Sequence, residues 1–175
     1  KILVTNHWLK KLGGSETFTY TLIGELVRQG NEVDLFTNVP GKVSKRIEKD
    51  FGVTQRLQER YDLILANHHT TVNEVFRLGR TVQTCHGVIP RLEQPSNNAD
   101  VRVGISEEIA DHIASKHIIW NGIDCKRFAP LKPLNDRPKR LLSLVHSDKA
   151  NILISKACVE LGILFVEVNK YKRQF

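Results

Sequence analysis

Cysteine is scarce in this chain of 175 residues, with single residues at positions 85, 125 and 158. Their number is odd, they lie far apart, and no CxxC motif or Cys/His ligand spacing accompanies them. These absences exclude a disulfide framework and a zinc site of the common spacings. We expect all three thiols to be reduced and buried.

Long apolar runs are also missing. No segment approaches the roughly 20 apolar residues that cross a bilayer, and the apolar stretch within residues 1–6 is too short for a signal peptide. With 41% hydrophobic and 26% charged residues, the composition is that of a globular protein with a packed core. We therefore expect a cytoplasmic protein, and peripheral contact with the inner face of a membrane stays an open alternative.

Acidic residues are too few to balance the basic ones, which leaves a formal net charge of +7. A basic excess favours anionic partners, among them nucleotide diphosphates, phosphorylated lipids, membrane surfaces and nucleic acid. A basic motif interleaved with aromatic residues is absent, so we expect no nucleic-acid partner. The basic residues are scattered, with a local concentration at Lys126, Arg127, Lys132, Arg137, Lys139 and Arg140.

Apolar strand-like segments alternate with helix-period segments along the chain, the pattern of βαβ units and a parallel sheet. We expect an α/β fold with a Rossmann-like parallel sheet and flanking helices. The strands are predicted at residues 2–5, 33–37, 61–66, 81–85, 101–105 and from 118. The helices are predicted at residues 15–28, 43–60, 71–78 and from an N-cap at Ser106 to about residue 115.

The pattern is interrupted once and then restarts. Residues 121–138 contain Pro and Asn and lack periodicity, which indicates a linker between residues 1–120 and residues 139–175. In the second part we expect a strand at 141–145, a helix at 150–161 that Gly162 ends, and a strand at 163–168. This amounts to a partial second Rossmann-like unit.

A glycine pair opens the first helix, in the segment Gly13-Gly14-Ser15-Glu16. Glycine lets the backbone adopt positive φ and approach a ligand closely, and the unpaired N–H groups of a helix start favour an anion. A phosphate or carboxylate site is one interpretation, and an ordinary βα turn with Ser15 as N-cap is the other. The GxGxxG fingerprint is absent and the preceding loop is long, so we disfavour an NAD-dependent enzyme.

Histidines follow two neighbouring predicted strands. His86 comes directly after residues 81–85, where ligands of open parallel sheets bind, and its ring can hydrogen-bond a sugar hydroxyl or a phosphoryl oxygen. A structural hydrogen-bonding role is the alternative. For His68 and His69, which follow residues 61–66, we expect solvent exposure and no shared metal ion.

Taken together, these segments resemble the retaining GT-B glycosyltransferases, a family that includes mannosyltransferases and sucrose synthases. The resemblance rests on the Gly-Gly-x-Glu opening, on residues 84–87 (TCHG), on residues 103–108 (VGISEE), and most of all on residues 121–124 (NGID) with Arg127, Phe128 and Pro130. It covers residues 1–130. It implies two Rossmann-like domains, the first (residues 1–120) for the acceptor and the second for the donor, a nucleotide-diphosphate sugar.

The resemblance also implies roles for single residues. His86 would act at the transferred sugar near the reacting carbon, and Gly13 and Gly14 would approach the donor diphosphate. Glu16 and His68 would lie on the acceptor side. The remaining implied positions are Asn121, Gly122 and Asp124 at the interdomain crossover and Lys149 at the donor phosphates.

The implied reaction needs no metal or other cofactor, and its acceptor is a carbohydrate, a lipid-linked glycan or a small molecule. Two features depart from the family pattern. The Arg that commonly accompanies the Lys at the diphosphate is missing from residues 146–149 (HSDK), and the family's two-glutamate motif is not found by Phe175. We therefore expect this chain alone to be inactive, and a non-catalytic sugar- or nucleotide-binding module stays open as the alternative.

Overall fold

The computed structural model describes residues 1–126, 128–129, 133, 136–143 and 148–167. The chain divides into two compact units, Lys1–Phe128 and Ala129–Phe175. The boundary between them falls inside the segment that the sequence predicts to be a linker.

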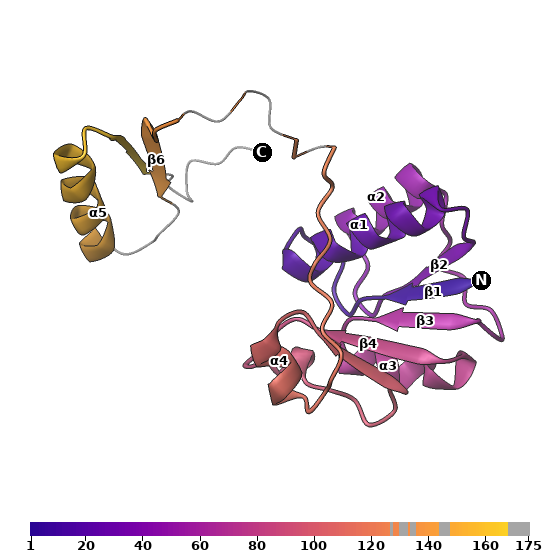
Figure 1. Ribbon diagram of the computed structural model, residues 1–175. Helices are drawn as coiled ribbons and strands as arrows, with labels where there is room; N and C mark the ends of the chain where they lie inside the picture. Colours follow the sequence, from indigo (N-terminus) through magenta and orange to yellow (C-terminus); the bar gives the residue numbers. More distant parts are fainter. Residues whose placement is uncertain (127, 130–132, 134–135, 144–147, 168–175) are drawn as a thin grey trace. The chain divides into compact units, whose positions relative to one another are not determined.

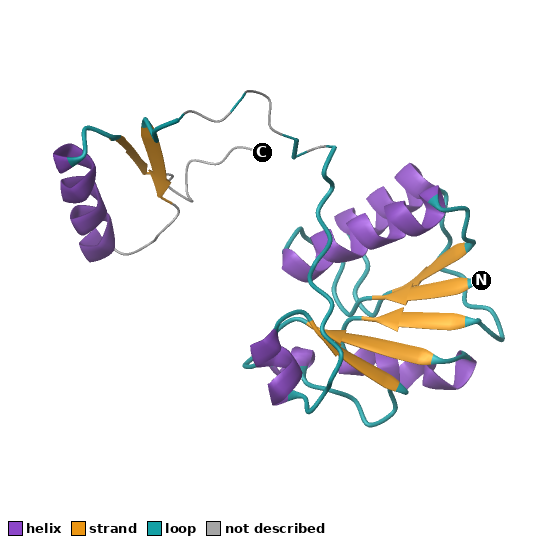
Figure 2. Cartoon of the chain, viewed as in Figure 1, coloured by secondary structure: helices purple, strands orange, loops and turns teal. Residues whose placement is uncertain are grey.

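The first unit is built on a five-stranded, all-parallel sheet (Figures 1 and 2). The strand order is β2-β1-β3-β4-β5, so the chain reverses direction across the sheet after β2. The Rossmann-like α/β fold predicted from the sequence is confirmed. The strands are β1 (Ile2–Thr5), β2 (Val33–Phe36), β3 (Leu63–Ala66), β4 (Thr81–Cys85) and β5 (Val101–Gly104).

Helices cover both faces of this sheet. Because successive side chains of a strand point to opposite faces, Val4 packs with α1 (Gly14–Arg28) and α2 (Lys42–Phe51), whereas Leu3 packs with α3 (His69–Val75). A short 3₁₀ turn, η1 (Phe76–Leu78), continues α3, and a second, η2 (Arg91–Glu93), follows β4. The last helix of the unit is α4 (Glu107–His112), which packs on Cys85 at the end of β4 through Ile109 and Ile113.

Two predicted elements are shorter than the sequence suggested. The helix expected over 43–60 ends at Phe51, because Gly52 takes up a left-handed conformation (φ 68°) that stops it. Thr54 then forms a parallel bridge with Asp34 beyond the edge of β2. The strand expected from residue 118 is reduced to one bridge between Ile118 and Gly104, and α4 already ends at His112.

Close packing explains the glycine of the segment at residues 103–108. A Cβ on Gly104 would lie 2.5 Å from the backbone nitrogen of Ala110, so a side chain there would push α4 away from β5. Ser106 is the N-cap of α4, as predicted, and its Oγ accepts a hydrogen bond from the N–H of Ile109 at 3.3 Å.

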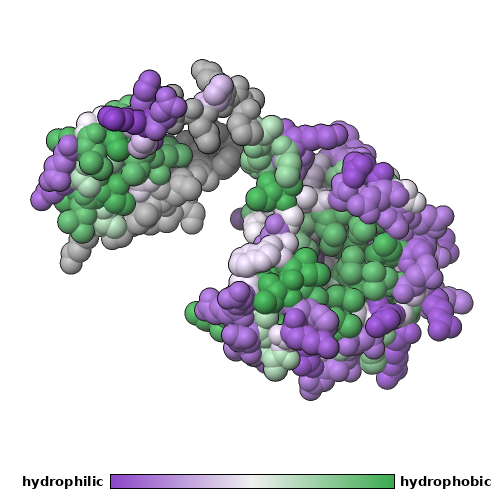
Figure 3. Space-filling model, in the orientation of Figure 1, coloured by the Kyte–Doolittle hydropathy of each residue, from purple (hydrophilic) through white to green (hydrophobic). Residues whose placement is uncertain are grey.

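The segment after α4 leaves apolar side chains uncovered. Trp120 is 69% exposed, and Ile119, Ile123 and Phe128 are exposed to a similar degree. Figure 3 shows apolar residues gathered on the face of the first unit that is turned to the viewer, where this segment runs. The absence of regular structure over residues 121–126 agrees with the predicted linker.

The second unit contains β6 (Arg140–Ser143), α5 (Asp148–Glu160) and β7 (Leu164–Glu167). The two strands pair in parallel, and Gly162, with a φ of 65°, follows the helix as predicted. The described residues of this unit therefore form a single βαβ unit. Cys85 and Cys158 are buried, but Cys125 is exposed, so the prediction of buried thiols is wrong at that position. Within the described residues, no helix is long and apolar enough to cross a membrane.

Candidate functional site

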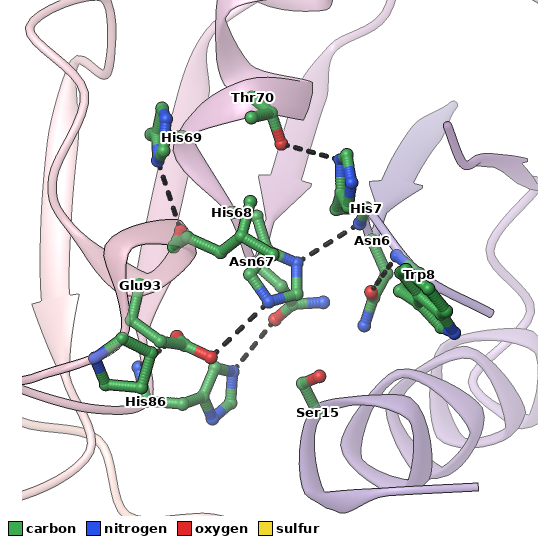
Figure 4. Close-up of polar contacts among 12 residues, drawn as sticks. Asn6, His7, Trp8, Ser15, Asn67, His68, His69, Thr70, His86 and Glu93 are labelled. Atoms are coloured by element: carbon green, nitrogen blue, oxygen red, sulfur yellow. Dashed lines mark hydrogen bonds and ion pairs between the residues drawn. The ribbon is translucent and has the colours of Figure 1, made fainter. Parts of the chain in front are cut away.

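Polar side chains converge at the carboxyl end of the parallel sheet (Figure 4). β1 leads into Asn6, His7 and Trp8, β3 leads into Asn67 and His68, and β4 leads into His86. The amino terminus of α1 lies beside them, since the rings of Phe18 and His86 meet edge to face with centroids 4.7 Å apart. Segments far apart in the sequence thus share one rim, which we call the carboxyl rim.

The amino terminus of α1 starts at Gly14, with Gly13 as the N-cap. The interpretation of Ser15 as N-cap is therefore wrong, because the helix starts one residue before it. Neither glycine uses positive φ. A Cβ on Gly13 would instead clash with the Glu16 carboxylate, which folds back over the N-cap, while a Cβ on Gly14 would meet nothing within 4 Å.

The space around Gly14 is therefore open, while the Glu16 carboxylate lies over the N-cap at Gly13. The first intrahelical bond runs from the N–H of Thr17 to the carbonyl of Gly13 at 3.1 Å, so the N–H groups of residues 14–16 precede it. Together with the positive end of the helix dipole, they favour an anion. The missing side chain at Gly14 lets a ligand come close to them.

His86 is held from two sides. Its backbone N–H donates to Glu93 Oε2 at 3.0 Å, and its ring Nε2 lies 3.0 Å from Asn67 Oδ1. Asn67 is itself buried, and its amide nitrogen donates to the carbonyl of Thr5 and to Thr19 Oγ1, both at 2.9 Å. Thr19 lies on α1, so this network ties the end of β1, the end of β3 and the first helix to His86.

His68 occupies the interior of the rim. It is 4% exposed, its Nδ1 accepts the backbone N–H of His7 at 3.1 Å, and its Nε2 lies 3.4 Å from Glu93 Oε1. The prediction that His68 is solvent-exposed is wrong, because the chain turns inward after β3 and both ring nitrogens find partners. Both ring nitrogens of His68 thus have partners within the protein, and neither is available to contact an acceptor substrate directly.

Burial sets the protonation of this site. Desolvation lowers the pKa of His86, an effect that His68 adds to and that the nearby Glu93 carboxylate opposes. For Glu93, burial raises the pKa, but the hydrogen bonds from His68 and from the His86 backbone outweigh it, so the net shift is downward. Near neutral pH, both shifts favour a neutral imidazole at His86 and an ionised carboxylate at Glu93.

The other predicted site residues lie elsewhere. Asn121, Gly122 and Asp124 are exposed and belong to the irregular segment after α4, and Asp124 Oδ1 accepts the N–H of Lys126 at 3.1 Å. Lys149 belongs to α5 of the second unit, and its side chain lies outside the described part of the chain. Of the predicted residues, the structure brings Gly13, Gly14, Glu16, His68 and His86 to the carboxyl rim.

Sequence reasoning missed Glu93 and Asn67. Glu93 lies in η2, in a loop without periodicity, and only the fold carries its carboxylate back to the ends of β3 and β4. Asn67 follows directly on an apolar strand. A polar amide at the carboxyl end of a buried strand was therefore the one available signal.

Two surface depressions lie near the amino ends of the strands, away from this rim. One is lined by residues that include Lys1, Asp34 and Thr54, and the other by residues that include Arg60, Arg77 and Arg80. Neither contains a glycine or a histidine of the rim. The described residues contain no group of three or more His, Cys, Asp or Glu side chains placed to hold a metal ion.

Comparison with known protein families yields no matching family model, and comparison with curated proteins yields no match. The arrangement of the carboxyl rim is therefore the basis for a functional proposal. It can hold an anion at α1 and a polar, hydroxyl-bearing group at His86.

Proposed function

We propose that this chain belongs to a glycosyltransferase that moves a sugar from a nucleotide-diphosphate sugar to a glycan, lipid or small-molecule acceptor with retention of anomeric configuration. The observation that supports the proposal most is that the open Gly14 turn and His86 share the carboxyl rim, where Phe18, one helical turn after Gly14, packs edge to face on the His86 ring. A nucleotide-diphosphate sugar carries an anion next to a hydroxyl-bearing ring, which are the two groups that this rim can hold.

The proposed division of roles follows from the contacts. The N–H groups of α1 and its dipole would stabilise negative charge on the diphosphate as the sugar leaves it, an electrostatic contribution that needs no metal ion. His86 would contact the transferred sugar. Residues 139–175 would begin the donor-binding domain, and the βαβ unit formed by β6, α5 and β7 supports that assignment.

The test is a transfer assay with the complete gene product that contains these residues. Uridine-, guanosine- and adenosine-diphosphate hexoses serve as donors, with oligosaccharides and lipid-linked glycans as acceptors. We expect His86→Ala to lower the rate by about 100-fold or more, the range of a lost charge-stabilising or acid–base contact. His117→Ala, an exposed histidine outside the rim, is the control and retains the rate.

Equal rates for the wild type and His86→Ala would contradict the proposal. The alternative, a non-catalytic sugar- or nucleotide-binding module, predicts a different result in the same assay. In that case the chain binds glycan or nucleotide in a titration, and no transfer or donor hydrolysis occurs with any of the donors.

A further inference from the structure

The hydrogen bonds around His86 determine where its ring carries a proton. A backbone carbonyl only accepts, so the Asn67 amide nitrogen must face the carbonyl of Thr5, and Asn67 Oδ1 must face His86. An amide oxygen also only accepts. The ring nitrogen of His86 that lies 3.0 Å from it, Nε2, must therefore be the protonated one.

Neighbouring contacts fix this direction further. Thr19 Oγ1 donates to the carbonyl of Ser15 at 2.8 Å, which leaves its lone pairs to accept from the amide nitrogens of Asn67 and Asn6. The amide of Asn6 cannot turn over either, because its Oδ1 accepts the backbone N–H of Trp8 at 2.9 Å. Backbone groups at both ends thus set the polarity of the whole chain of hydrogen bonds.

The tautomer of His68 is fixed in the same way. Its Nδ1 accepts the backbone N–H of His7, so the proton of the ring lies on Nε2, which faces Glu93 Oε1. Glu93 in turn accepts the backbone N–H of His86 with its second oxygen, Oε2. The carboxylate therefore links the His68 ring to the backbone that carries the His86 ring.

The second ring nitrogen of His86, Nδ1, faces away from this network. Within the part of the chain that the structure describes, no protein group is hydrogen-bonded to it, and no side-chain nitrogen or oxygen is both buried and without a partner. Nδ1 therefore reaches solvent. The His86 ring lies next to α1, since Phe18, in the second turn of that helix, meets it edge to face.

We propose that His86 is a neutral ring protonated on Nε2, with its tautomer set by Asn67 and its backbone positioned by Glu93 and His68, so that Nδ1 is an acceptor for the hydroxyl group of a sugar and not a donor to a phosphoryl oxygen. This deepens the proposed function and rests on it for the identity of the ligand. Each phosphate of a nucleotide-diphosphate sugar is fully ionised near neutral pH and has no hydrogen to donate to Nδ1. The ring therefore favours the sugar over the diphosphate.

The tautomer is tested first, without any ligand, by ¹⁵N-detected NMR of the histidine rings in the whole chain at neutral pH. We expect His86 to show a protonated Nε2 and an unprotonated Nδ1. A His86 ring that carries its proton on Nδ1, or on both nitrogens, would overturn the inference. That result would leave the proposed glycosyl transfer standing, because the transfer assay does not depend on the tautomer.

Ligand preference is tested by titration with D-glucose and, separately, with dimethyl phosphate, an anion that carries no ionisable hydrogen at neutral pH, both at matched ionic strength. We expect glucose to shift the Nδ1 signal of His86 and dimethyl phosphate to leave it unchanged. A ring that responds to dimethyl phosphate, or to neither probe, contradicts the hydroxyl assignment. If glucose acts as expected while the complete gene product transfers no sugar, the proposed function fails and the present inference holds.

The positioning role is tested with Glu93→Gln. The two donors face different oxygens of Glu93, and glutamine places an NH2 group where one of these oxygens lies, so it loses either the His86 backbone or His68 as a donor. We expect the affinity of glucose to fall about tenfold. His68→Asn is the second variant. It keeps an acceptor for the N–H of His7 but is too short to reach Glu93, so we expect the same tenfold loss of glucose affinity. It replaces Glu93→Gln as the test if that variant does not fold.

His117→Gln is the matched control, since this exposed histidine lies outside the rim and has no contact with Glu93. It should leave the His86 signals and the glucose affinity unchanged. Folded Glu93→Gln and His68→Asn variants with wild-type glucose affinity and wild-type His86 signals would show that both residues are merely structural, and would overturn the proposal.

Discussion

At the scale of single residues, buried polar groups give this rim its chemistry. Asn67 and Thr19 are almost fully buried, yet each finds hydrogen-bond partners on other elements. In an environment of low dielectric, a satisfied network of this kind holds its members in one orientation. His86 is the member that ends the network at the surface, so its protonation is coupled to the stability of the fold.

The free energy of unfolding should depend on pH through His86. The pKa of His86 in the folded state lies below its usual value of 6.5, chiefly because burial disfavours the charged ring. Below pH 6.5 the unfolded chain therefore binds more protons at this position than the folded chain does. We expect the free energy of unfolding to decrease as the pH falls from 6.5 toward the folded-state pKa, measured by urea unfolding at several pH values.

A comparison of variants isolates this contribution. His86→Gln removes the titrating group, so it should show a smaller decrease in stability over this pH range, while His117→Gln should retain the wild-type decrease. An unchanged slope in His86→Gln would contradict the assignment to His86.

Glu93 contributes to stability at lower pH. Its pKa is below 4.5, so its stabilising contribution is present above that value and is lost as the pH falls through the folded-state pKa.

At the scale of elements, the start of α1 combines two requirements. A helix favours a side chain at its first position, whereas a ligand that binds helix N–H groups needs the backbone to be accessible. Gly14 satisfies the second requirement. It has no close neighbours and no positive φ, so nothing in the fold itself demands glycine there.

We predict that Gly14→Ala separates stability from binding. The new methyl group fits without a clash and reduces the entropy of the unfolded chain, so stability should rise by about 0.5 kcal/mol, measured by thermal unfolding. In the same variant, the affinity for uridine diphosphate, measured by titration, should fall about tenfold because the methyl group covers the N–H groups.

Gly122→Ala provides the comparison. Gly122 also has open space around it, but it lies in the irregular segment after α4, so the affinity for uridine diphosphate should be unaffected. If Gly14→Ala binds uridine diphosphate as the wild type does, the amino terminus of α1 is an ordinary helix start and not an anion site.

At the scale of the whole molecule, the two units differ in how much they bury. The first has a five-stranded sheet with helices on both faces, whereas the described residues of the second form a two-stranded sheet with one helix. Several large apolar residues of the second unit are exposed, among them Leu142, Leu153 and Leu164. Two strands and a helix bury too little apolar surface for much independent stability.

Hydrogen–deuterium exchange of the whole chain should reveal this difference. We expect amides of β1, β3 and β4 to be protected close to the limit of global unfolding, and amides of β6 and β7 to exchange about 100-fold faster or more. Chain cleavage after Phe128 should leave the protection of the first unit unchanged. Equal protection of both units would indicate that they fold together as one cooperative body.

The sequence by itself determined the fold class and most of the elements. Its alternation of apolar strands with helical periods depends on local side-chain spacing, and it placed β1, α1, β4 and the N-cap at Ser106 correctly. It also placed Gly14 at the start of the first helix and His86 at the end of a strand, and both lie at one edge because in a parallel sheet every strand ends at the same edge. The helix predicted over 43–60 was too long because the stop at Gly52 was overlooked.

Only the tertiary structure decided what His68, Asn67 and Glu93 do. Their contacts join residues that are 7 to 62 positions apart in the chain, and no local pattern encodes such a distance. Burial of His68 follows from the inward turn after β3, and the role of Glu93 follows from the path of the loop after β4. The sequence supplies the side chains and their chemistry. Their partners, and hence their protonation, are determined only when the sheet brings the loops together.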